Sequence, residues 1–289
     1  MKIKKLVATV LCASAALSAF AFASCGENSD SAKVKLIDVK LTDEEYAFVI
    51  DKENNALVTD FNAFFADFKA DGSFQKIMDK YFKGTGTKVG YPVSTGEVTN
   101  NEATFVVATN CPFEPFEYIG DDGKIYGLDI EVAAAYAEAK DLELVVKNIP
   151  VFDDIFTQVD NGYADIGMAG LTASEDRKEL YNFTETYYNA SQQIIVAADN
   201  TDFDNCKTAE DVEQVLASLQ NKKIGFQTGT TGNWYVAGSE DWGYNGFANI
   251  DAKGYQTAQD AVTDLINGNI YAVVVDNAPA NAIVTAVNK

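Results

Sequence analysis

The sequence contains no histidine, which removes the most common general base and a common metal-binding side chain from any site it forms. Histidine-dependent catalytic triads are excluded for the same reason. Cysteine is scarce, with four residues and no CxxC pair. Low-complexity tracts and coiled-coil heptads are absent, and only five prolines occur in 289 residues. With 47% hydrophobic residues, the composition is globular and sufficient for one large core or two modest ones.

Basic residues are also few. The chain has 22 Lys and Arg against 43 Asp and Glu, which gives a formal net charge of −21. An excess of negative charge repels nucleic acids and anionic lipid surfaces. We therefore expect no nucleic-acid partner, and we interpret the charge mainly as a source of solubility outside the cell.

The N-terminal residues have the layout of a secretory signal peptide. A basic start precedes the apolar run Leu6–Phe22, which is too short and too rich in alanine and serine for a membrane span. The motif Phe22-Ala23-Ser24-Cys25 resembles a bacterial lipobox, with Phe22 where leucine is usual. We therefore expect a signal peptide at 1–24, a lipidated Cys25 and a tether at 25–33. The alternative is an ordinary cleaved signal with an incidental Cys25.

This reading predicts an extracytoplasmic protein that is anchored to the outer face of the cell membrane through its lipid alone. Two further cysteines, Cys111 and Cys206, are far apart in the sequence. The sequence leaves open whether they form a disulfide.

Residues 34–103 read as two strands, two helices and a linker. Val34–Asp38 and Tyr46–Ile50 have strand patterns. Two apolar stripes at helical spacing follow, at 57–68 and 74–82, and Ser73 is placed to cap the second helix. Residues 84–103 are rich in Gly, Thr, Ser and Asn, which is typical of a linker.

After residue 103, strands and helices alternate, which predicts an α/β fold with a mainly parallel sheet. The second α/β set begins at Lys222, and the two lobes are expected to join near 193–198. The strands are expected at 104–109, 142–147, 164–169, 193–198, 223–226 and 270–275, and the helices at 127–140, 152–161, 172–180 and 258–268.

A loop at 170–177 has features of an anion site. Thr172 and Glu175 have the spacing of a capping box, and a helix N-terminus presents free N–H groups to an anion. Arg177 lies in the first turns of that helix and can bind a carboxylate through two parallel hydrogen bonds. The alternative is a capped helix with a solvated arginine.

Two further positions follow strands. The loop 228–232 combines glycines that allow close backbone approach with threonine hydroxyls, although no lysine follows as in a phosphate loop. It fits an ordinary strand–helix turn equally well. Asp276 lies at the carboxyl end of the strand 273–275, where open α/β sheets bind ligands. Its carboxylate can bind an ammonium group or cap the helix that follows.

Together these residues resemble the polar-amino-acid-binding proteins of ABC importers, the bacterial family 3 extracellular solute-binding proteins. The resemblance implies an α/β, two-lobed periplasmic-binding-protein-like fold of type II, with a hinge between the lobes. The matching blocks occur in the family's order, at 107–110, 115–118, 127–131, 165–172, 175–177, 182–188, 223–232 and 272–276.

Residues 34–82 resemble the closing segment of that family, which usually follows the strand that ends at Asp276. The resemblance therefore implies a circular permutation, in which Lys289 logically continues into Ala32. The expected parts are a second-lobe strand and turn at 34–46, a hinge return strand and closing helices of the first lobe at 47–83, a linker at 84–103, the first lobe at 104–194 and the second lobe at 195–289. The alternatives are an unrelated extension, or exchange of the segment between two chains.

The resemblance also implies a mechanism in which two lobes close on a free amino acid. Arg177, with the N–H groups near Thr172, would bind the α-carboxylate. Asp276, with the Gly170 carbonyl, would bind the α-ammonium group. All residues expected in the site follow the linker.

The ligand's side chain would lie between Phe113 and Phe152, and the second lobe would complete the pocket with Gln227, Thr230 and Thr231. Asn110 occupies a position where relatives that bind cations or amides often carry an acid. We therefore expect a neutral polar amino acid, although the nearby Glu114 leaves a basic ligand open.

The expected function is binding of a free amino acid and its delivery to the permease subunits of an ABC importer, without catalysis, cofactor or metal. Two alternatives stay open. The protein could sense a ligand for a receptor, or be a binding-protein-derived enzyme such as a dehydratase. With no histidine, Glu114 or Glu117 would then have to serve as the acid.

Overall fold

The computed structural model describes residues 32–96, 100–240 and 242–289. The described residues belong to one compact unit within 32–289. The expected signal peptide and Cys25 lie outside the described residues. Within this unit, two five-stranded sheets with flanking helices confirm the expected α/β class.

The first sheet and its helices form what we call the first lobe. The sheet has the order β7-β4-β8-β3-β9, with β4 parallel to β7 and β8, and β3 antiparallel to its neighbours. Its strands are β7 (Glu143–Asn148), β4 (Thr104–Thr109), β8 (Ile166–Gly167), β3 (Val49–Ile50) and β9 (Asn182–Phe183). The accompanying elements are α1 (Asn55–Ala70), α2 (Ser73–Phe82), α3 (Leu128–Ala139), α4 (Asp154–Asp160), α5 (Glu175–Leu180) and the hairpin of β5 (Tyr118–Ile119) with β6 (Ile125–Tyr126).

The second sheet and its helices form the second lobe. The sheet has the order β1-β11-β14-β12-β13, in which β12 is parallel to β13 and β14, while β11 is antiparallel to β1 and β14. Its strands are β1 (Val34–Ile37), β11 (Gln192–Ala197), β14 (Ala272–Asp276), β12 (Lys223–Gln227) and β13 (Asp251–Tyr255). The helices are α6 (Ala209–Ser218), α7 (Thr231–Ala237), α8 (Ala258–Ile266) and α9 (Asn277–Val287).

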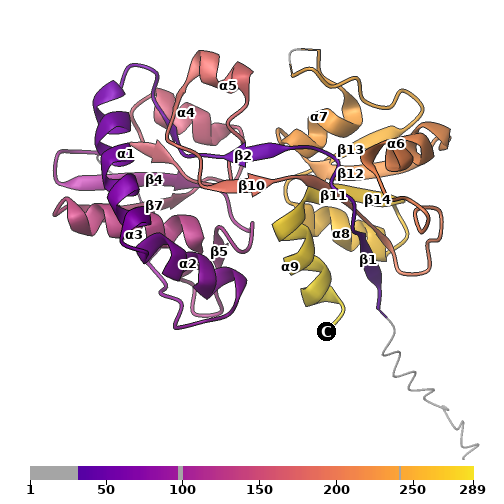
Figure 1. Cartoon of the computed structure of the whole chain (residues 1–289), viewed down its shortest axis with the longest axis horizontal. Helices are drawn as coiled ribbons and strands as arrows, with labels where there is room; N and C mark the ends of the chain where they lie inside the picture. The colour runs from indigo at the N-terminus through magenta and orange to yellow at the C-terminus, as the bar shows by residue number, and fades with distance from the viewer. Residues whose placement is uncertain (1–31, 97–99, 241) are drawn as a thin grey trace, which may run out of the picture. The chain divides into compact units, whose positions relative to one another are not determined.

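Two short strands carry the chain between the sheets. β2 (Glu44–Tyr46) and β10 (Tyr188–Ala190) pair antiparallel, and Figure 1 shows them running side by side. The chain crosses between the sheets first at β2 and again at β10. All of β11 belongs to the second sheet, so the crossing at β10 lies before the lobe boundary that the sequence predicted between residues 194 and 195. The expected strand at 46–50 is divided between β2 and β3, because it changes partner from β10 to the first sheet.

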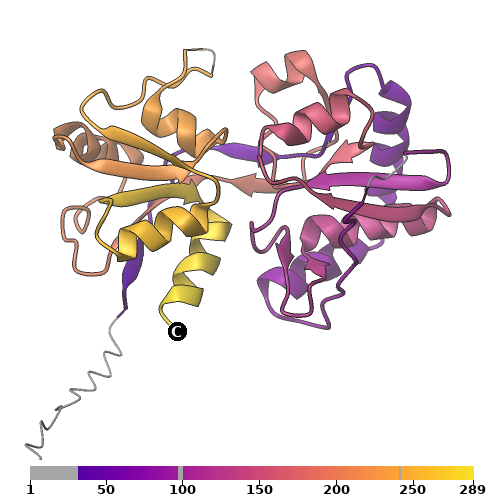
Figure 2. The same ribbon diagram turned by 180° about the vertical axis from the view of Figure 1, so that it is seen from behind.

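The N-terminal segment contributes to both sheets. β1 is an edge strand of the second sheet, and the backbone N–H of Lys33 donates to the Asn288 side-chain oxygen at 2.8 Å. The Asn288 amide nitrogen donates to the Val34 carbonyl, also at 2.8 Å. The beginning of β1 and the end of α9 therefore lie side by side (Figures 1 and 2). β3 completes the first sheet between β8 and β9.

The two helices after β3 bury the expected apolar stripes against the first lobe. Phe61 and Phe65 of α1 have no exposed surface, and the Phe61 ring lies 4.8 Å from that of Tyr136 in α3. The cap expected from Ser73 is wrong. Gly72, at a φ of +80°, holds the N-cap position, because Asp71 turns the chain there by accepting the Ser73 N–H.

The expected linker at 84–103 lies along the first lobe in its described part. Tyr91 and Ile125 exchange two backbone hydrogen bonds of 2.9 Å, and Ser94 donates to the Val146 carbonyl. The backbone of Val89 donates to a carboxylate oxygen of Glu131. These bonds attach the segment to the β5–β6 hairpin, α3 and the edge strand β7.

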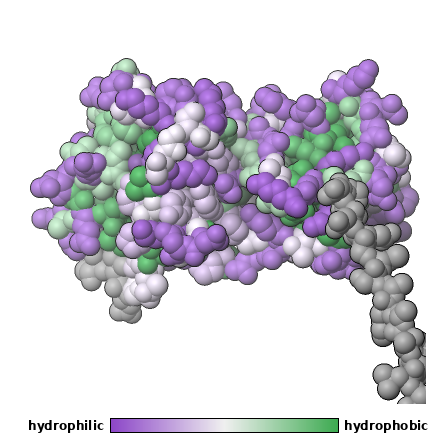
Figure 3. All heavy atoms as spheres, turned by 90° about the horizontal axis from the view of Figure 1, so that it is seen from below, coloured by the Kyte–Doolittle hydropathy of each residue, from purple (hydrophilic) through white to green (hydrophobic). Residues whose placement is uncertain are grey.

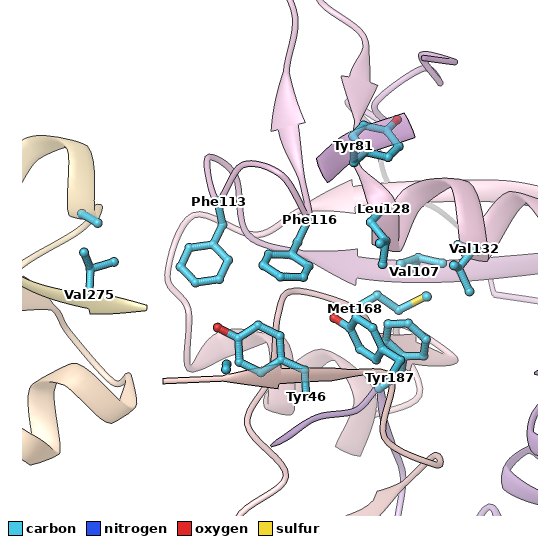
Figure 4. Close-up of a cluster of buried hydrophobic side chains, with 14 of the residues drawn as sticks. Tyr46, Tyr81, Val107, Phe113, Phe116, Leu128, Val132, Met168, Tyr187 and Val275 are labelled. Atoms are coloured by element: carbon cyan, nitrogen blue, oxygen red, sulfur yellow. The ribbon is translucent and has the colours of Figure 1, made fainter. Parts of the chain in front are cut away.

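Aromatic side chains fill the core beside the crossing strands. The ring of Tyr46 in β2 lies edge-on to Phe116 at 5.1 Å and close to Tyr187 at 6.3 Å. Figure 4 shows Tyr46 opposite Phe113 and Phe116, with its hydroxyl directed toward the side where Val275 of β14 lies. The core thus extends from the first lobe toward the end of a strand in the second.

The surface is largely polar on the face seen in Figure 3, where hydrophobic residues appear in smaller patches. Within the described ranges, no helix is both long and apolar enough to span a bilayer. Cys111 and Cys206 are both free thiols in the described part of the chain. This answers the question about a disulfide between them that the sequence left open.

Candidate functional site

One cavity is lined by side chains of both lobes. Its volume is about 10 Å³, which is room for about one water molecule, so the lobes must separate to admit a larger ligand. It is lined by all ten residues that the sequence singled out, Asn110, Phe113, Phe152, Gly170, Thr172, Arg177, Gln227, Thr230, Thr231 and Asp276, together with Glu117 and Ala169.

Strand ends bring these residues together. Asn110 follows β4, Gln227 ends β12 and Asp276 ends β14, while Gly170 follows β8 after two residues. These are parallel strands of the two sheets, and ligands of open α/β sheets bind beyond the carboxyl ends of such strands. The loops that follow therefore face one another across the cavity.

Arg177 is the buried cation of this site. Its side chain is 4% exposed, and burial lowers its pKa to about 10, which leaves it charged at neutral pH. One terminal nitrogen donates to the Thr172 carbonyl at 3.0 Å, and the other donates across the cleft to the Gly229 carbonyl at 3.3 Å. Its remaining N–H donors are suited to a planar carboxylate.

The expected capping box at Thr172 is wrong. α5 begins at Glu175, and its cap is Ser174, whose hydroxyl accepts the Arg177 N–H at 3.4 Å. The backbone of Thr172 forms an antiparallel bridge with Tyr46, which keeps it extended before the helix. Its hydroxyl instead donates to Glu44 at 2.6 Å.

Three carboxylates act on the charge of Arg177, first Asp153, then Glu44 and Asp276. Asp276 is 7% exposed and Glu44 is 6% exposed. Burial, and then the negative charge of Glu44, raise the pKa of Asp276 to about 7. Within the described part of the chain, Asp276 occupies the N-cap position of α9 without a capping hydrogen bond, and its Oδ1 accepts from the Tyr46 hydroxyl at 2.5 Å. Helix capping therefore does not explain why an aspartate occupies position 276.

Glu44 and Tyr46 are site-supporting residues that sequence reasoning missed. Both lie on β2, which precedes the linker, so the expectation that the whole site follows the linker is wrong for its supporting residues. One feature of the sequence could have identified them together: they are two positions apart, which places both side chains on the same face of a strand. Glu44 also accepts hydrogen bonds from Thr42 and Gln192.

Amide groups meet at another part of the cavity. The Asn110 side chain donates to the Ile149 carbonyl at 2.7 Å and accepts from the Gln227 amide nitrogen at 2.8 Å. The latter bond crosses between the lobes. Gly170 has a φ of +56°, and a Cβ there would lie 2.6 Å from the Phe113 ring. Glycine at this position therefore lets the Phe113 ring pack closely against the loop after β8.

Glu117 is an acid in the cavity lining. Its side chain is 1% exposed, and among the described residues neither carboxyl oxygen has a hydrogen-bond partner. Burial, and then the negative charge of the nearby Asp129, raise its pKa well above the usual value, which favours the protonated carboxyl. Glu114 does not line this cavity, and its carboxylate lies 3.5 Å from Lys88 instead.

The threonines of the second lobe hold the loop before α7. Thr230 donates from its hydroxyl to the Gln227 carbonyl at 2.8 Å, and its position is the N-cap of α7. Thr231 donates to the Thr172 hydroxyl across the cleft at 3.4 Å. Gly229 has a φ of +80°, and a Cβ there would come within 2.4 Å of the Asp153 carboxylate. The loop thus contacts the first lobe closely through its backbone.

The family model described as bacterial extracellular solute-binding proteins, family 3, matches residues 105–277. The chain belongs to this family. A probable histidine-binding protein of Neisseria gonorrhoeae is 28% identical over 62% of this chain and 61% of its own length. The L-cystine-binding protein TcyJ of Escherichia coli K12 is 28% identical over 64% of this chain and 63% of its own length. The match therefore spans about three fifths of these family members.

Solved structures agree with the family. The arginine-bound form of a truncated ArgBP from T. maritima has a TM-score of 0.55 and 30% identity, over 64% of this chain and 78% of its own. An ancestral amino-acid-binding protein, AncCDT-1, described as a precursor of cyclohexadienyl dehydratase, has a TM-score of 0.54 and 25% identity, over 64% and 75%. The two-lobed type II fold expected from the family's motifs is confirmed.

Proposed function

We infer that this protein binds a free amino acid outside the cell and delivers it to the permease subunits of an ABC importer. One observation carries the proposal: a buried guanidinium, Arg177, and a buried carboxylate, Asp276, line the same small cavity. An α-amino acid carries the complementary pair of charges. Arg177 would bind its α-carboxylate, and Asp276, supported by Glu44, would bind its α-ammonium group.

The ligand's side chain would be neutral and polar. Asn110 and Gln227 present amides, and Glu117 adds a carboxyl whose oxygens have no hydrogen-bond partner among the described residues. A cationic side chain would have to leave water in this small cavity, and burial of a charge costs free energy. The named relatives bind histidine, cystine or arginine, so their names do not select one ligand class.

A thermal-shift screen over the twenty common amino acids tests this proposal. A ligand at 100-fold its dissociation constant stabilises the folded state by about 2.7 kcal/mol. We expect a neutral polar amino acid to raise the melting temperature, and Arg177→Ala to abolish the shift. The matched control is Lys178→Ala, since Lys178 is the next residue and pairs with Glu175 on the helix surface. A screen in which no amino acid shifts the melting temperature would contradict the proposal.

The proposal includes the anchor and the order of the chain. Cys25 carries a lipid on the outer face of the membrane, and residues 34–83 take the part of the family's closing segment in a circularly permuted chain. The support for the second statement is that β1 pairs with β11 and that Lys33 hydrogen-bonds to Asn288. The tether then enters the second lobe. Replacing Cys25 with alanine should release the protein from the membrane fraction.

A second candidate, a dehydratase-like enzyme, is favoured by one observation. Glu117 is the kind of unpaired cavity acid that such an enzyme requires, because burial raises its pKa and a carboxyl that retains its proton can donate it to a leaving group. Incubation with each stabilising amino acid, followed by mass spectrometry, separates the two functions. Recovery of unchanged ligand supports binding alone, whereas product that disappears in Glu117→Gln supports the enzyme.

A further inference from the structure

Two aromatic pairs enclose the guanidinium of Arg177. Its central carbon lies 4.8 Å from the Phe156 ring centroid and 5.6 Å from that of Phe152, both in the first lobe. It also lies 4.8 Å from Trp234 and 5.4 Å from Trp242, both in the second lobe. A cation within about 6 Å of a ring centroid is attracted by the negative face of the ring. Arg177 therefore has aromatic partners on both sides of the cleft.

The tryptophans form a unit of their own. Trp234 lies in α7 and Trp242 in the segment after it, and their rings stack with centroids 3.8 Å apart and an interplanar angle of 7°. They are the only two tryptophans of the chain. Both keep part of their surface in solvent, whereas Arg177 is almost fully buried. This pair therefore helps to shield Arg177 from water.

The geometry exists only while the lobes are closed. The rings belong to the second lobe and the cation to the first, so any hinge opening that widens the cleft separates them. The hydrogen bond from Arg177 to the Gly229 carbonyl would break in the same movement. Cation–π attraction is strongest where water is excluded, which is the closed arrangement described here.

We propose that Trp234 and Trp242 form an aromatic latch that closes over Arg177 and slows reopening of the cleft. They are positioning residues, which hold the carboxylate-binding side chain rather than replace it. The latch rests on the proposed function insofar as closure traps an amino acid on Arg177. It predicts that affinity depends on the tryptophan faces mainly through the dissociation rate.

The test compares leucine and phenylalanine at each position in the full chain. Leucine keeps apolar bulk but has no π-face, whereas phenylalanine keeps the face. Phe247→Leu is the matched control, because Phe247 packs on Tyr235 at 5.6 Å in the same lobe and has no ring contact with Arg177 among the described residues. Circular dichroism melts first establish that each variant is folded.

Two measurements follow, with an equimolar mixture of the nineteen common amino acids other than tryptophan as the probe, because free tryptophan would mask the fluorescence of the protein. Small-angle X-ray scattering, with and without the mixture, reports how far the lobes close. Stopped-flow fluorescence after rapid dilution reports the reopening rate, since each single variant retains one tryptophan. We expect Trp234→Leu and Trp242→Leu to reopen about 10- to 30-fold faster, or to be measurably more open, with the phenylalanine variants and Phe247→Leu within about threefold of the original chain.

Leucine variants that close as fully and reopen as slowly as the original chain would overturn the latch, as would an original chain that is open under both conditions. If the original chain is already closed without the mixture, leucine variants that are more open than it would support the latch. That last result, combined with no response to the mixture, would support the latch and count against amino-acid binding, so the two proposals fail separately.

Discussion

The hydroxyl of Tyr46 donates a 2.5 Å hydrogen bond to the carboxylate of Asp276, 230 positions later in the chain. Tyr46 lies on a strand that crosses between the sheets, and Asp276 ends a strand of the second sheet. Both side chains are buried. The bond therefore ties the crossing region directly to the acid that we assign to the ligand's ammonium group.

Removing this donor should destabilise the protein. We expect Tyr46→Phe to lower the free energy of unfolding by about 1–3 kcal/mol, because Asp276 stays buried but loses a partner. Urea unfolding measures the change. Tyr235→Phe serves as the control, since Tyr235 donates at 3.3 Å to Glu213 in a partly exposed position. Equal effects of the two substitutions would count against a special role for the Tyr46–Asp276 bond.

The stability of the ligand-free protein should depend on pH through Asp276. Its folded-state pKa of about 7 exceeds the unfolded value of about 4, so the folded protein binds this proton more tightly. Asp276 therefore contributes stability that is fully present below about pH 4 and is lost as pH rises to about 7.

Urea unfolding between pH 4 and pH 8 tests this contribution in the variant Asp276→Asn. We expect the variant to lose less stability than the original chain as pH rises over this range. Asp67→Asn, on the exposed face of α1, is the control and should leave the slope unchanged. If Asp276→Asn leaves the slope unchanged as well, the carboxyl of Asp276 is not the group responsible.

Ligand affinity should have the opposite pH dependence. An ammonium group binds the ionised form of Asp276, so affinity should fall about tenfold per pH unit below pH 7 and level off above it. Isothermal titration calorimetry between pH 5.5 and 8.5, with the amino acid that gives the largest thermal shift, measures the profile. A flat profile would show that Asp276 does not titrate against the ligand.

Reordering the chain should preserve the fold. A variant that begins at residue 100, runs to Lys289 and continues through a short linker into 32–96 should unfold at a similar urea concentration. The reason is that Lys33 and Asn288 already hydrogen-bond to each other. Far-ultraviolet circular dichroism and urea unfolding provide the check. A reordered chain that fails to fold would argue against a permuted arrangement.

The sequence predicted the parts of the site that depend on strand ends. Asn110, Gln227 and Asp276 follow buried apolar strands, and parallel strands bring such ends together, so local patterns were sufficient. The helix start predicted at 170–177 pointed to Arg177 as a carboxylate-binding side chain, and the family motifs gave it the α-carboxylate. All of them line the cavity.

What the sequence did not reveal depends on contacts between distant segments. Glu44 contacts Thr172 because β2 runs beside the loop that precedes α5. No local sequence pattern predicts this contact. The same bridge keeps Thr172 extended, so the N-cap of α5 is Ser174 and not Thr172 as the sequence predicted. The stacking of Trp234 on Trp242 depends on how the segment after α7 folds back, which apolar periodicity does not encode.

A crystal structure of the chain with its best-stabilising amino acid tests the central claim most directly. The account predicts that the ligand's α-carboxylate lies within hydrogen-bonding distance of the Arg177 guanidinium and its ammonium group within the same distance of the Asp276 carboxylate. A ligand that contacts neither residue, or that occupies a different cavity, would contradict it.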